Sequence, residues 1–398
     1  MHDKELVGLA RMIMRFREAV KETLRDNEEF HAALNGEVPI RFEGLGPYPN
    51  EYLIDPSDAL FWNDPEAYTD ELDRWQSAYY IDTHTETIEY LTKTDQKAVF
   101  LDLVDAIRKK RVAPFVGAGL SQPSGFPLWG EAIKLLVVKL EGVSASEVKA
   151  DQPGLRYLKK VKALTGKGKY VEAAQVLYEN AKTQVDNFIR TKFSLPASPN
   201  QEDIHGAIKL LPDISDGCIV TTNFDELIEQ VYIARDRPLQ GYMHGTQKGN
   251  KFIASLIKGD RCILKLHGNV SDHETYIFSK QQYDDAYGAT GTDYGKPLPK
   301  ALRQIFISHS LLFLGCSLEQ DRTLTLLEEV VRTGAFEVPE HFAIVAKLST
   351  HAAQQAKEDH LLQLRIRPLW YETPGGSHNY VEALLSLATD CARDYIKL

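Results

Sequence analysis

The chain has 398 residues, of which 43% are hydrophobic and 26% charged, a balance typical of a globular protein with a full hydrophobic core. No apolar run reaches the roughly 18 residues that a membrane-spanning helix requires, so no membrane contact is expected. The net charge is −10, and residues 1–97 carry 21 acidic and 10 basic side chains, whereas the remainder is close to neutral. Because nucleic-acid-binding proteins usually present a basic face, we expect no direct contact with DNA or RNA.

Residues 1–97 are predicted to form an acidic, mostly helical N-terminal extension. Apolar residues recur at helical spacing over residues 4–34, and a second helical stretch covers about residues 70–91. Residues 35–67 hold five prolines and several aromatic side chains, which predicts a loop that packs against other parts of the protein. The extension would be an oligomer or partner surface, or a cover over the edge of the main domain. We expect a homo-oligomer.

Residues 98–398 are predicted to form a doubly wound, Rossmann-like α/β domain. Short apolar runs without alternation are typical of strands covered on both faces of a parallel sheet, and about six occur: Val112–Val116, Cys218–Thr221, Cys262–Leu266, Leu311–Leu314, Phe342–Ala346 and Ile366–Leu369. Helical stretches are predicted between and after them: Leu128–Leu140, Tyr170–Thr191, Glu202–Leu211, Asp225–Ala234, Leu318–Val331 and His378–Ile396. The connection at about 122–217 predicts a helical insertion, because a bare loop of that length is rare in a compact domain.

Cysteine usage points to a reducing, cytoplasmic setting. Cys218, Cys262, Cys316 and Cys391 lie far apart and form no C-x-x-C pair, so neither a disulfide framework nor a zinc site is expected. A basic cluster at residues 108–111 is predicted to lie at the C-terminal end of a helix, where cations favour the helix dipole.

The segment VAPFVGAGLS, residues 112–121, is predicted to be a strand, a glycine-rich turn and the start of a helix. Gly117, Ala118 and Gly119 would let the backbone approach an anion, and Ser121 follows just beyond. The pattern fits a dinucleotide phosphate site, although such glycines also serve purely structural turns.

Three further strand ends carry polar or small residues. Thr222, Asn223 and Asp225 follow the second strand, where they would face a ligand or cap the next helix. His267 follows the third strand as a general base or a hydrogen-bonded turn residue. Gly315 and Ser317 follow the fourth. Because the carboxyl ends of parallel strands meet at one edge of a sheet, the four segments are expected to form one site.

The segments GAGLSQPSGFPLW, TTNFD, KLHG and GCS, in this order, resemble the signature segments of the sirtuin superfamily over about residues 98–398. Protein deacylases of that family carry a four-cysteine zinc module, Asp-Phe-Arg after the S-G-x-P bend, and a glutamine before the catalytic asparagine. Here there are no paired cysteines, the bend leads to Leu128 and Trp129, and Thr222 replaces the glutamine. The variant pattern is similar to sirtuin-like effectors of bacterial antiphage defence, which are NAD hydrolases.

The resemblance implies hydrolysis of the nicotinamide glycosidic bond of NAD, with no zinc. Asn223 would position the attacking water or a ribose hydroxyl, His267 would act as the base, and Asp225 would fix the nicotinamide-side geometry or Asn223 itself. The cofactor-binding residues would be Gly117, Ala118, Gly119 and Ser121 at the pyrophosphate, Thr222 beside Asn223, and Gly315 and Ser317 at the adenosine ribose.

Other functions stay open at this point. One is an ADP-ribosyl cyclase, transferase or protein deacylase, and another is a non-catalytic subunit that binds NAD or ADP-ribose in a partner complex. The resemblance also implies a partner, such as a HerA-type ATPase or a short Argonaute, or a nucleotide signal that switches the protein on. His378, in the turn before the last helix, is expected to begin that helix, with the site as its alternative place.

Overall fold

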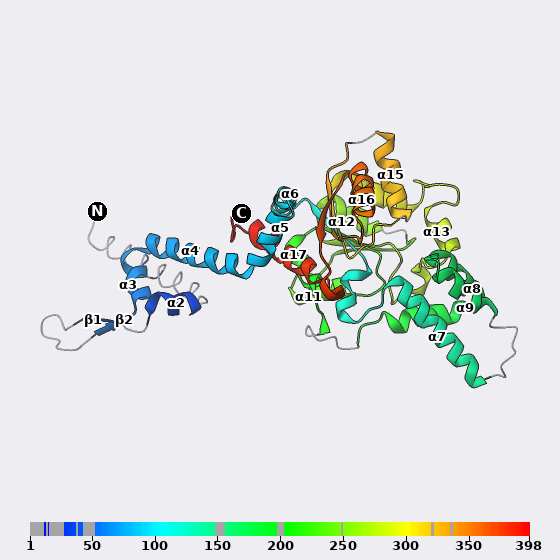
Figure 1. The fold of residues 1–398 in the computed structure, drawn as a ribbon, viewed down its shortest axis with the longest axis horizontal. Helices are drawn as coiled ribbons and strands as arrows, with labels where there is room; N and C mark the ends of the chain where they lie inside the picture. Colours follow the sequence, from blue (N-terminus) through cyan, green and yellow to red (C-terminus); the bar gives the residue numbers. More distant parts are fainter. Residues whose placement is uncertain are drawn as a thin grey trace. The chain divides into compact units, whose positions relative to one another are not determined.

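The computed structural model describes residues 12, 15, 28–36, 39–42, 52–147, 156–196, 203–247, 250–319, 322–334 and 337–398. Contacts divide the chain into two units (Figure 1), one comprising residues 1–85 and 394–398 and the other residues 86–393. The division by contacts falls at residue 85, and a functional boundary near residue 97 stays a prediction. Among the described helices, none is both long and apolar enough to cross a membrane.

The smaller unit has three helices and a short hairpin in its described part. The elements are α2 (Glu28–Asn35), β1 (Ile40–Phe42), β2 (Tyr52–Ile54), α3 (Pro56–Asn63) and α4 (Pro65–Thr83), with β1 and β2 antiparallel. Their core contains Phe30, Phe61, Tyr68 and Leu72. This part is helical as predicted, although most of the helix predicted over residues 4–34 lies outside the described residues.

The loop predicted over residues 35–67 is wrong for its second half, which contains α3 and the start of α4. Pro56 and Pro65 each occupy the first turn of a helix. Proline fits there because the amide it lacks would have no partner within the helix. The second predicted helix, about 70–91, is in fact α4 followed by α5 (Thr85–Lys93), and α4 ends at its C-cap, His84.

The larger unit is built on a seven-stranded sheet whose pairs are all parallel, in the order β5-β6-β4-β3-β7-β8-β9. The strands are β3 (Val112–Val116), β4 (Cys218–Thr221), β5 (Gly241–His244), β6 (Cys262–Lys265), β7 (Ser310–Leu314), β8 (His341–Ala346) and β9 (Ile366–Tyr371). The doubly wound α/β prediction is confirmed, and all six predicted strands are present. The strand that the sequence prediction missed, β5, lies at the edge of the sheet.

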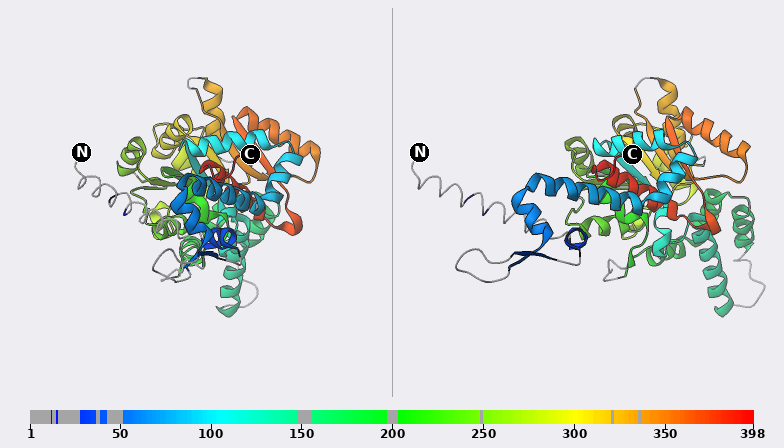
Figure 2. Two further views of the ribbon diagram at one scale, coloured as in Figure 1. Left: turned by 90° about the vertical axis from the view of Figure 1, so that its left-hand side faces the viewer. Right: turned by 60° about the vertical axis from the view of Figure 1, so that its left-hand side comes forward.

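Helices cover both faces of the sheet (Figure 2). One layer contains α6 (Lys97–Arg108), α10 (Leu211–Ile214), α11 (Leu227–Ala234) and α17 (Asn379–Ala392). The core of the other face takes side chains from α12 (Asn250–Lys258), α13 (Lys280–Tyr287), α14 (Pro297–Ser308), α15 (Arg322–Thr333) and α16 (His351–Gln363). This double cover buries every residue of β3, β4 and β6, which explains their continuous apolar runs.

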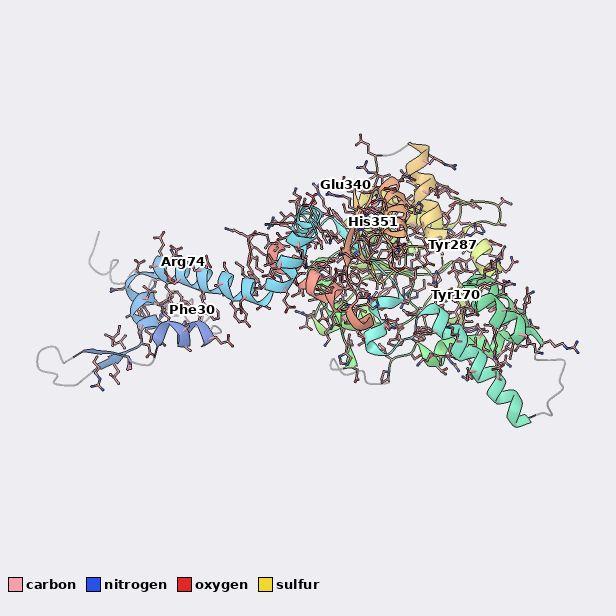
Figure 3. All side chains as sticks on the ribbon, in the orientation of Figure 1. Phe30, Arg74, Tyr170, Tyr287, Glu340 and His351 are labelled. Carbon is pink, nitrogen blue, oxygen red and sulfur yellow. The ribbon has the colours of Figure 1, made fainter. Side chains whose placement is uncertain are left out.

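The predicted insertion between β3 and β4 is helical, with α7 (Trp129–Glu147), α8 (Arg156–Thr165) and α9 (Tyr170–Lys192). Tyr170 at the start of α9 and Tyr287 at the end of α13 are labelled in Figure 3. The helix predicted over residues 202–211 is wrong in its described part. Gly206 has φ +79°, which a right-handed helix cannot contain, so only the 3-10 helix η5 (Ala207–Leu210) and the short α10 follow it.

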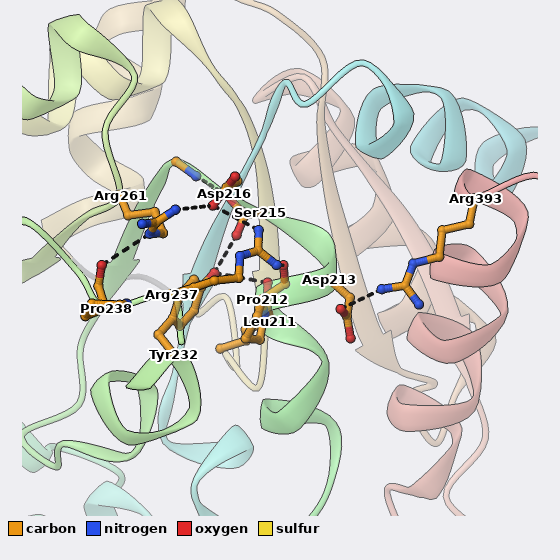
Figure 4. Close-up of polar contacts among 11 residues, drawn as sticks. Leu211, Pro212, Asp213, Ser215, Asp216, Tyr232, Arg237, Pro238, Arg261 and Arg393 are labelled. Atoms are coloured by element: carbon orange, nitrogen blue, oxygen red, sulfur yellow. Dashed lines mark hydrogen bonds and ion pairs between the residues drawn. The ribbon is translucent and has the colours of Figure 1, made fainter. Parts of the chain in front are cut away.

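Ion pairs fasten the amino-terminal edge of the sheet (Figure 4). Asp216, before β4, pairs with both Arg237 and Arg261 at 2.9 Å, and Asp213 pairs with Arg393 at 2.6 Å. The basic cluster behaves as predicted: Arg108 lies in the last turn of α6, and its guanidinium donates to the Cys391 carbonyl of α17 at 2.8 Å. These charged groups lie at the amino-terminal edge of the sheet, and the predicted site residues lie at the opposite edge.

Candidate functional site

A cavity of about 820 Å³ opens at the carboxyl ends of β6, β4, β3 and β7, the edge at which ligands bind in open α/β sheets. All ten predicted site residues line it: Gly117, Ala118, Gly119, Ser121, Thr222, Asn223, Asp225, His267, Gly315 and Ser317. The strands thus bring together four segments that are far apart in the sequence.

The glycine turn after β3 packs directly against the backbone after β7. The Gly117 amide donates to the Leu314 carbonyl at 2.8 Å and the Gly119 amide to the Gly315 carbonyl at 3.0 Å. A Cβ atom on Gly117 would lie 2.5 Å from the Gly315 oxygen. Gly315 itself has φ +64°, and a Cβ there would lie 2.4 Å from the Leu120 amide nitrogen. Side chains are therefore excluded at Gly117 and Gly315 by space.

The predicted helix start after this turn is two 3-10 turns, η1 (Ala118–Leu120) and η2 (Gln122–Ser124), and α7 begins only at Trp129. Gly125 has φ +86° and ends η2. The amides of Gly119 and Leu120 already donate to protein carbonyls. The turn thus offers a ligand close approach to its backbone and the Ser121 hydroxyl, rather than the first turn of an α-helix.

Asn223 is held in one orientation at the centre of the cavity. Its Nδ2 donates to the Gly117 carbonyl at 3.2 Å and to Ser121 Oγ at 2.9 Å. Its amide nitrogen donates to Thr221 Oγ1 at 3.0 Å, and that hydroxyl donates to the Val116 carbonyl at 2.9 Å. Because both Nδ2 protons are used inside the protein, a ligand can approach only Oδ1, which also accepts a long hydrogen bond from the Thr222 hydroxyl at 3.5 Å. The helix-capping alternative therefore does not apply to Asn223.

Asp225 does cap the helix that follows, since its Oδ1 accepts from the Leu227 amide at 3.2 Å, at the start of α11. The side chain is also buried, with 3% exposure, and lines the cavity. Burial raises the pKa of the Asp225 carboxyl, and the positive charge of Lys265 opposes that rise. Capping and site placement are thus combined in one residue.

Lys265 is hydrogen-bonded to the backbone of Asp225, and the sequence analysis did not predict it as part of the site. Its side chain is completely buried, and its ammonium donates to the Asp225 carbonyl and to Glu229 Oε1, the latter at 3.0 Å. The other oxygen of Glu229 is buried without a hydrogen-bond partner. Lys265 ends a buried strand and has no acidic residue four positions later. The sequence therefore gave no sign of its role, because its partner, Glu229, lies on α11.

His267 lies beside Asn223's loop and is electrically neutral at physiological pH. Burial lowers the pKa of His267 to about 4, and a hydrogen bond to the Thr222 backbone opposes the shift. The Nε2 atom is 2.8 Å from the hydroxyl of Tyr283, on α13. With one ring nitrogen engaged by a backbone carbonyl as donor, Nε2 is the basic nitrogen and accepts the tyrosine proton. Tyr283 is the second residue that sequence reasoning missed.

Aromatic rings form the wall behind His267. The Trp129 ring lies 6.1 Å from the His267 ring and 4.9 Å from that of Phe278, measured between centroids. Phe224 stacks nearly parallel to Trp129 at 6.5 Å. These rings cover one side of the imidazole, and burial is the main cause of its depressed pKa. The start of α9 adds Lys169, Tyr170 and Glu172 to the lining, and these ordinary residue types carry no sequence signal.

In the described part of the chain, neither a cluster of metal-binding side chains nor the cysteines form a further site. There, no group of three or more histidine, cysteine or acidic side chains is placed to hold a metal ion. All four cysteines are free thiols, and Cys316 alone of them lines the cavity. His378 is the N-cap residue of α17, as predicted, and its Nδ1 contacts the Tyr371 hydroxyl at 2.7 Å.

Comparison with known proteins agrees with these segments. Residues 217–369 match the SIR2-like domain family. A protein of Acinetobacter baumannii (strain 532279) named NAD(+) hydrolase ThsA is 22% identical over 260 residues, which cover 64% of this chain and 46% of that protein. The protein of the same name from Cytobacillus dafuensis is 22% identical over 234 residues, covering 58% of this chain and 40% of the relative.

The chain thus spans less than half the length of these curated relatives. A solved chain reported as "Structural Basis for the Mechanism and Regulation of Sir2 Enzymes" is 16% identical, with a TM-score of 0.32, and the match covers 74% of this chain and 97% of that one. The family match includes Asn223, His267 and Gly315. The family match thus confirms the resemblance to the sirtuin superfamily over residues 217–369, and the segment GAGLSQPSGFPLW lies outside that match.

Replacing Lys265 with methionine is expected to destabilise the fold by about 3–5 kcal/mol, because a buried carboxylate loses its cation. Urea denaturation followed by circular dichroism measures this loss. The double variant Lys265→Met/Glu229→Leu, which removes both charges, is expected to recover most of it. A single variant as stable as the wild type would contradict the supporting role of Lys265.

The depressed pKa of His267 predicts a loss of stability in acid. Between about pH 6.5 and pH 4 the unfolded chain binds a proton that folded His267 does not, so the free energy of unfolding falls as pH falls. By pH 4.5 this residue alone would contribute a loss of about 2 kcal/mol. His244 and His341, with pKa values lowered by burial to about 4 and about 3, act in the same direction.

The comparison of wild type with His267→Gln isolates the contribution of His267. Urea denaturation at pH 7 and pH 4.5 should show a smaller loss for His267→Gln than for the wild type. An equal loss in both proteins would show that folded His267 titrates like an ordinary histidine.

Proposed function

We propose that this chain is an NAD hydrolase that cleaves the nicotinamide glycosidic bond and releases nicotinamide and ADP-ribose. The observation that carries the proposal is the placement of Asn223, Asp225 and a neutral His267 around one cavity of about 820 Å³. The similarity to proteins named NAD(+) hydrolase supports it. NAD would be the substrate, and no metal enters the proposed reaction.

Cleavage of the nicotinamide glycosidic bond requires little acid catalysis from the protein. When the bond between C1′ and the nicotinamide nitrogen breaks, the electron pair leaves on nicotinamide, which departs as a neutral molecule. Positive charge develops on the ribose, as in other glycosidic cleavages, and water then bonds to C1′ and gives up a proton. The site therefore has to position the ribose and water, stabilise the cationic ribose and accept one proton.

We assign the positioning role to Asn223. Its Nδ2 is occupied by Gly117 and Ser121, so its Oδ1 is directed by two fixed hydrogen bonds rather than by the ligand. An acceptor oxygen held in this way suits a water molecule or a ribose hydroxyl that must donate a hydrogen bond. Preorganisation of this kind costs nothing at the moment of reaction.

We assign the role of base to His267 and that of electrostatic support to Asp225. His267 has an unprotonated nitrogen at neutral pH, as a base requires. Because this nitrogen accepts from the Tyr283 hydroxyl, the proton of the attacking water would reach it through that hydroxyl. The Asp225 carboxylate, which Lys265 favours in its charged form, would fix the nicotinamide-side geometry and face the cationic ribose. Gly117, Ala118, Gly119, Ser121 and Thr222 would contact the pyrophosphate side, and Gly315 and Ser317 the adenosine ribose.

The activity is tested by incubating the purified full chain with NAD and measuring nicotinamide and ADP-ribose by chromatography. Asn223→Ala and His267→Ala are each expected to reduce turnover by about 100-fold or more, the usual scale for loss of a positioned polar group or base. Asn180→Ala and His309→Ala are matched controls, since neither residue lines the cavity, and both should retain wild-type turnover.

The products decide among the other functions. A cyclic product would indicate a cyclase, and ADP-ribose attached to protein would indicate a transferase. Binding of NAD measured by calorimetry, with no turnover under any activating condition, would indicate a regulatory subunit. Turnover unchanged in Asn223→Ala and His267→Ala would refute the assigned site.

We also propose that the protein acts in antiphage defence as an NAD-depleting effector in the cytoplasm, regulated by self-association or by a partner such as a HerA-type ATPase or a short Argonaute. The support is the resemblance of its variant segments to such effectors, and the need to keep an NAD hydrolase inactive until it is required.

A homo-oligomer is the expected form in solution. Light scattering of the full chain, performed with and without NAD, measures its mass against that of a 44.9 kDa protomer. A monodisperse monomer with full activity would contradict the proposal.

A further inference from the structure

A second cavity, of about 570 Å³, adjoins the candidate site. Val171, Glu172, Tyr283 and Leu324 line both cavities. The remainder of its lining is polar, with charged side chains from α13, α15 and α16, including Lys280, Arg322 and His360. The two spaces therefore meet at a shared wall, and none of the roles assigned above uses the second one.

Tyr283 is the member of this wall that contacts the candidate base. Its hydroxyl lies 2.8 Å from His267 Nε2, and the two rings meet edge to face with centroids 5.4 Å apart. His267 lines the first cavity and does not line the second. The tyrosine ring consequently stands between the second cavity and the imidazole.

The helix that carries Tyr283 is capped at its start and bound to two neighbouring helices. Ser279 and Gln282 form a capping box at the start of α13. The Gln281 amide donates to the Gln175 side chain of α9 at 2.8 Å, and Asp284 pairs with Arg322 of α15 at 2.5 Å. Because α13 is hydrogen-bonded to α9 and ion-paired with α15, the Tyr283 ring is held in place in the wall between the two cavities.

We propose that Tyr283 determines which nucleophile reaches the ribose, because its ring separates the second cavity from His267, so that water reacts and larger hydroxyl compounds do not. The inference rests on the proposed NAD hydrolase function. In the wild type the C1′–nicotinamide bond breaks, the water oxygen bonds to C1′, and its proton leaves to the base. With the ring removed, an alcohol oxygen would bond to C1′ in the same way, lose its proton, and give an O-alkyl ADP-ribose together with nicotinamide.

The test measures how NAD is divided between water and an added alcohol. Wild type and Tyr283→Ala are incubated with NAD and either methanol or glycerol, and the products are separated by chromatography and identified by mass. In the wild type we expect capture by glycerol to be far below capture by methanol. In Tyr283→Ala we expect the glycerol adduct, as a fraction of nicotinamide released, to rise at least about tenfold.

Two variants separate the ring from other causes. Tyr283→Phe keeps the ring and loses only the hydroxyl, so it should keep the wild-type product ratio even if its turnover changes. His360→Ala removes a ring from the lining of the second cavity alone and should also keep that ratio. If Tyr283→Ala does not remain folded at the assay temperature, Tyr283→Leu, which is shorter but still apolar, makes the same test.

Each outcome bears on a separate claim. Nicotinamide release by Tyr283→Ala with an unchanged product ratio would overturn the inference and leave the proposed function standing. Capture of glycerol by Tyr283→Phe as efficient as by Tyr283→Ala would show that the hydroxyl, and not the ring, controls access. Absence of nicotinamide release from the wild type, both alone and with a HerA-type ATPase, a short Argonaute or a nucleotide signal added, would refute the proposed function and the inference together.

Discussion

The site depends on a contact between two stretches of backbone that leaves no room for a side chain. Gly117 and Gly119, after the central strand β3, pack against Gly315, after β7, with amide-to-carbonyl distances of 2.8 and 3.0 Å at this junction. Because no side chain intervenes, Asn223 can reach the Gly117 carbonyl from the neighbouring strand β4. The orientation of the candidate positioning residue thus follows from where two backbones touch. A Cβ atom at Gly117 would collide with the Gly315 carbonyl and the Cys316 thiol and would force the two backbones apart.

Much of this fold is encoded in short-range patterns, and so could be predicted from sequence. Strands buried on both faces are continuous apolar runs, and six of them fall where predicted. The edge strand β5 was missed because its residues alternate between buried and exposed over only four positions. The helices α3 and α4 were hidden by prolines that begin them rather than break them. In each case the local pattern was compatible with two structures, and tertiary packing decided between them.

The site divides in a similar way. The residues at the strand ends could be gathered from sequence, because parallel strands place their carboxyl ends at one edge. Lys265 and Tyr283 could not, because their importance lies in partners on other elements. Lys265 pairs with Glu229 on α11. Tyr283, on α13, is hydrogen-bonded to His267, which follows β6. The neutral state of His267 likewise follows from Trp129 and Phe224, contributed by the helical insertion and the loop after β4.

The order of the strands also matters during synthesis of the protein. The central strand β3 ends at Val116, whereas its neighbour β7 begins at Ser310, after the insertion and three other strands have been made. A nascent chain on the ribosome can therefore pair β4 with both β3 and β6 while it still lacks Gly315, which lines the cavity. Asn223, Asp225 and His267 emerge before β7, but the complete cavity cannot form until Gly315 has also been made. For a chain that we propose consumes NAD, a truncated product that ends before β7 is expected to lack the closed site.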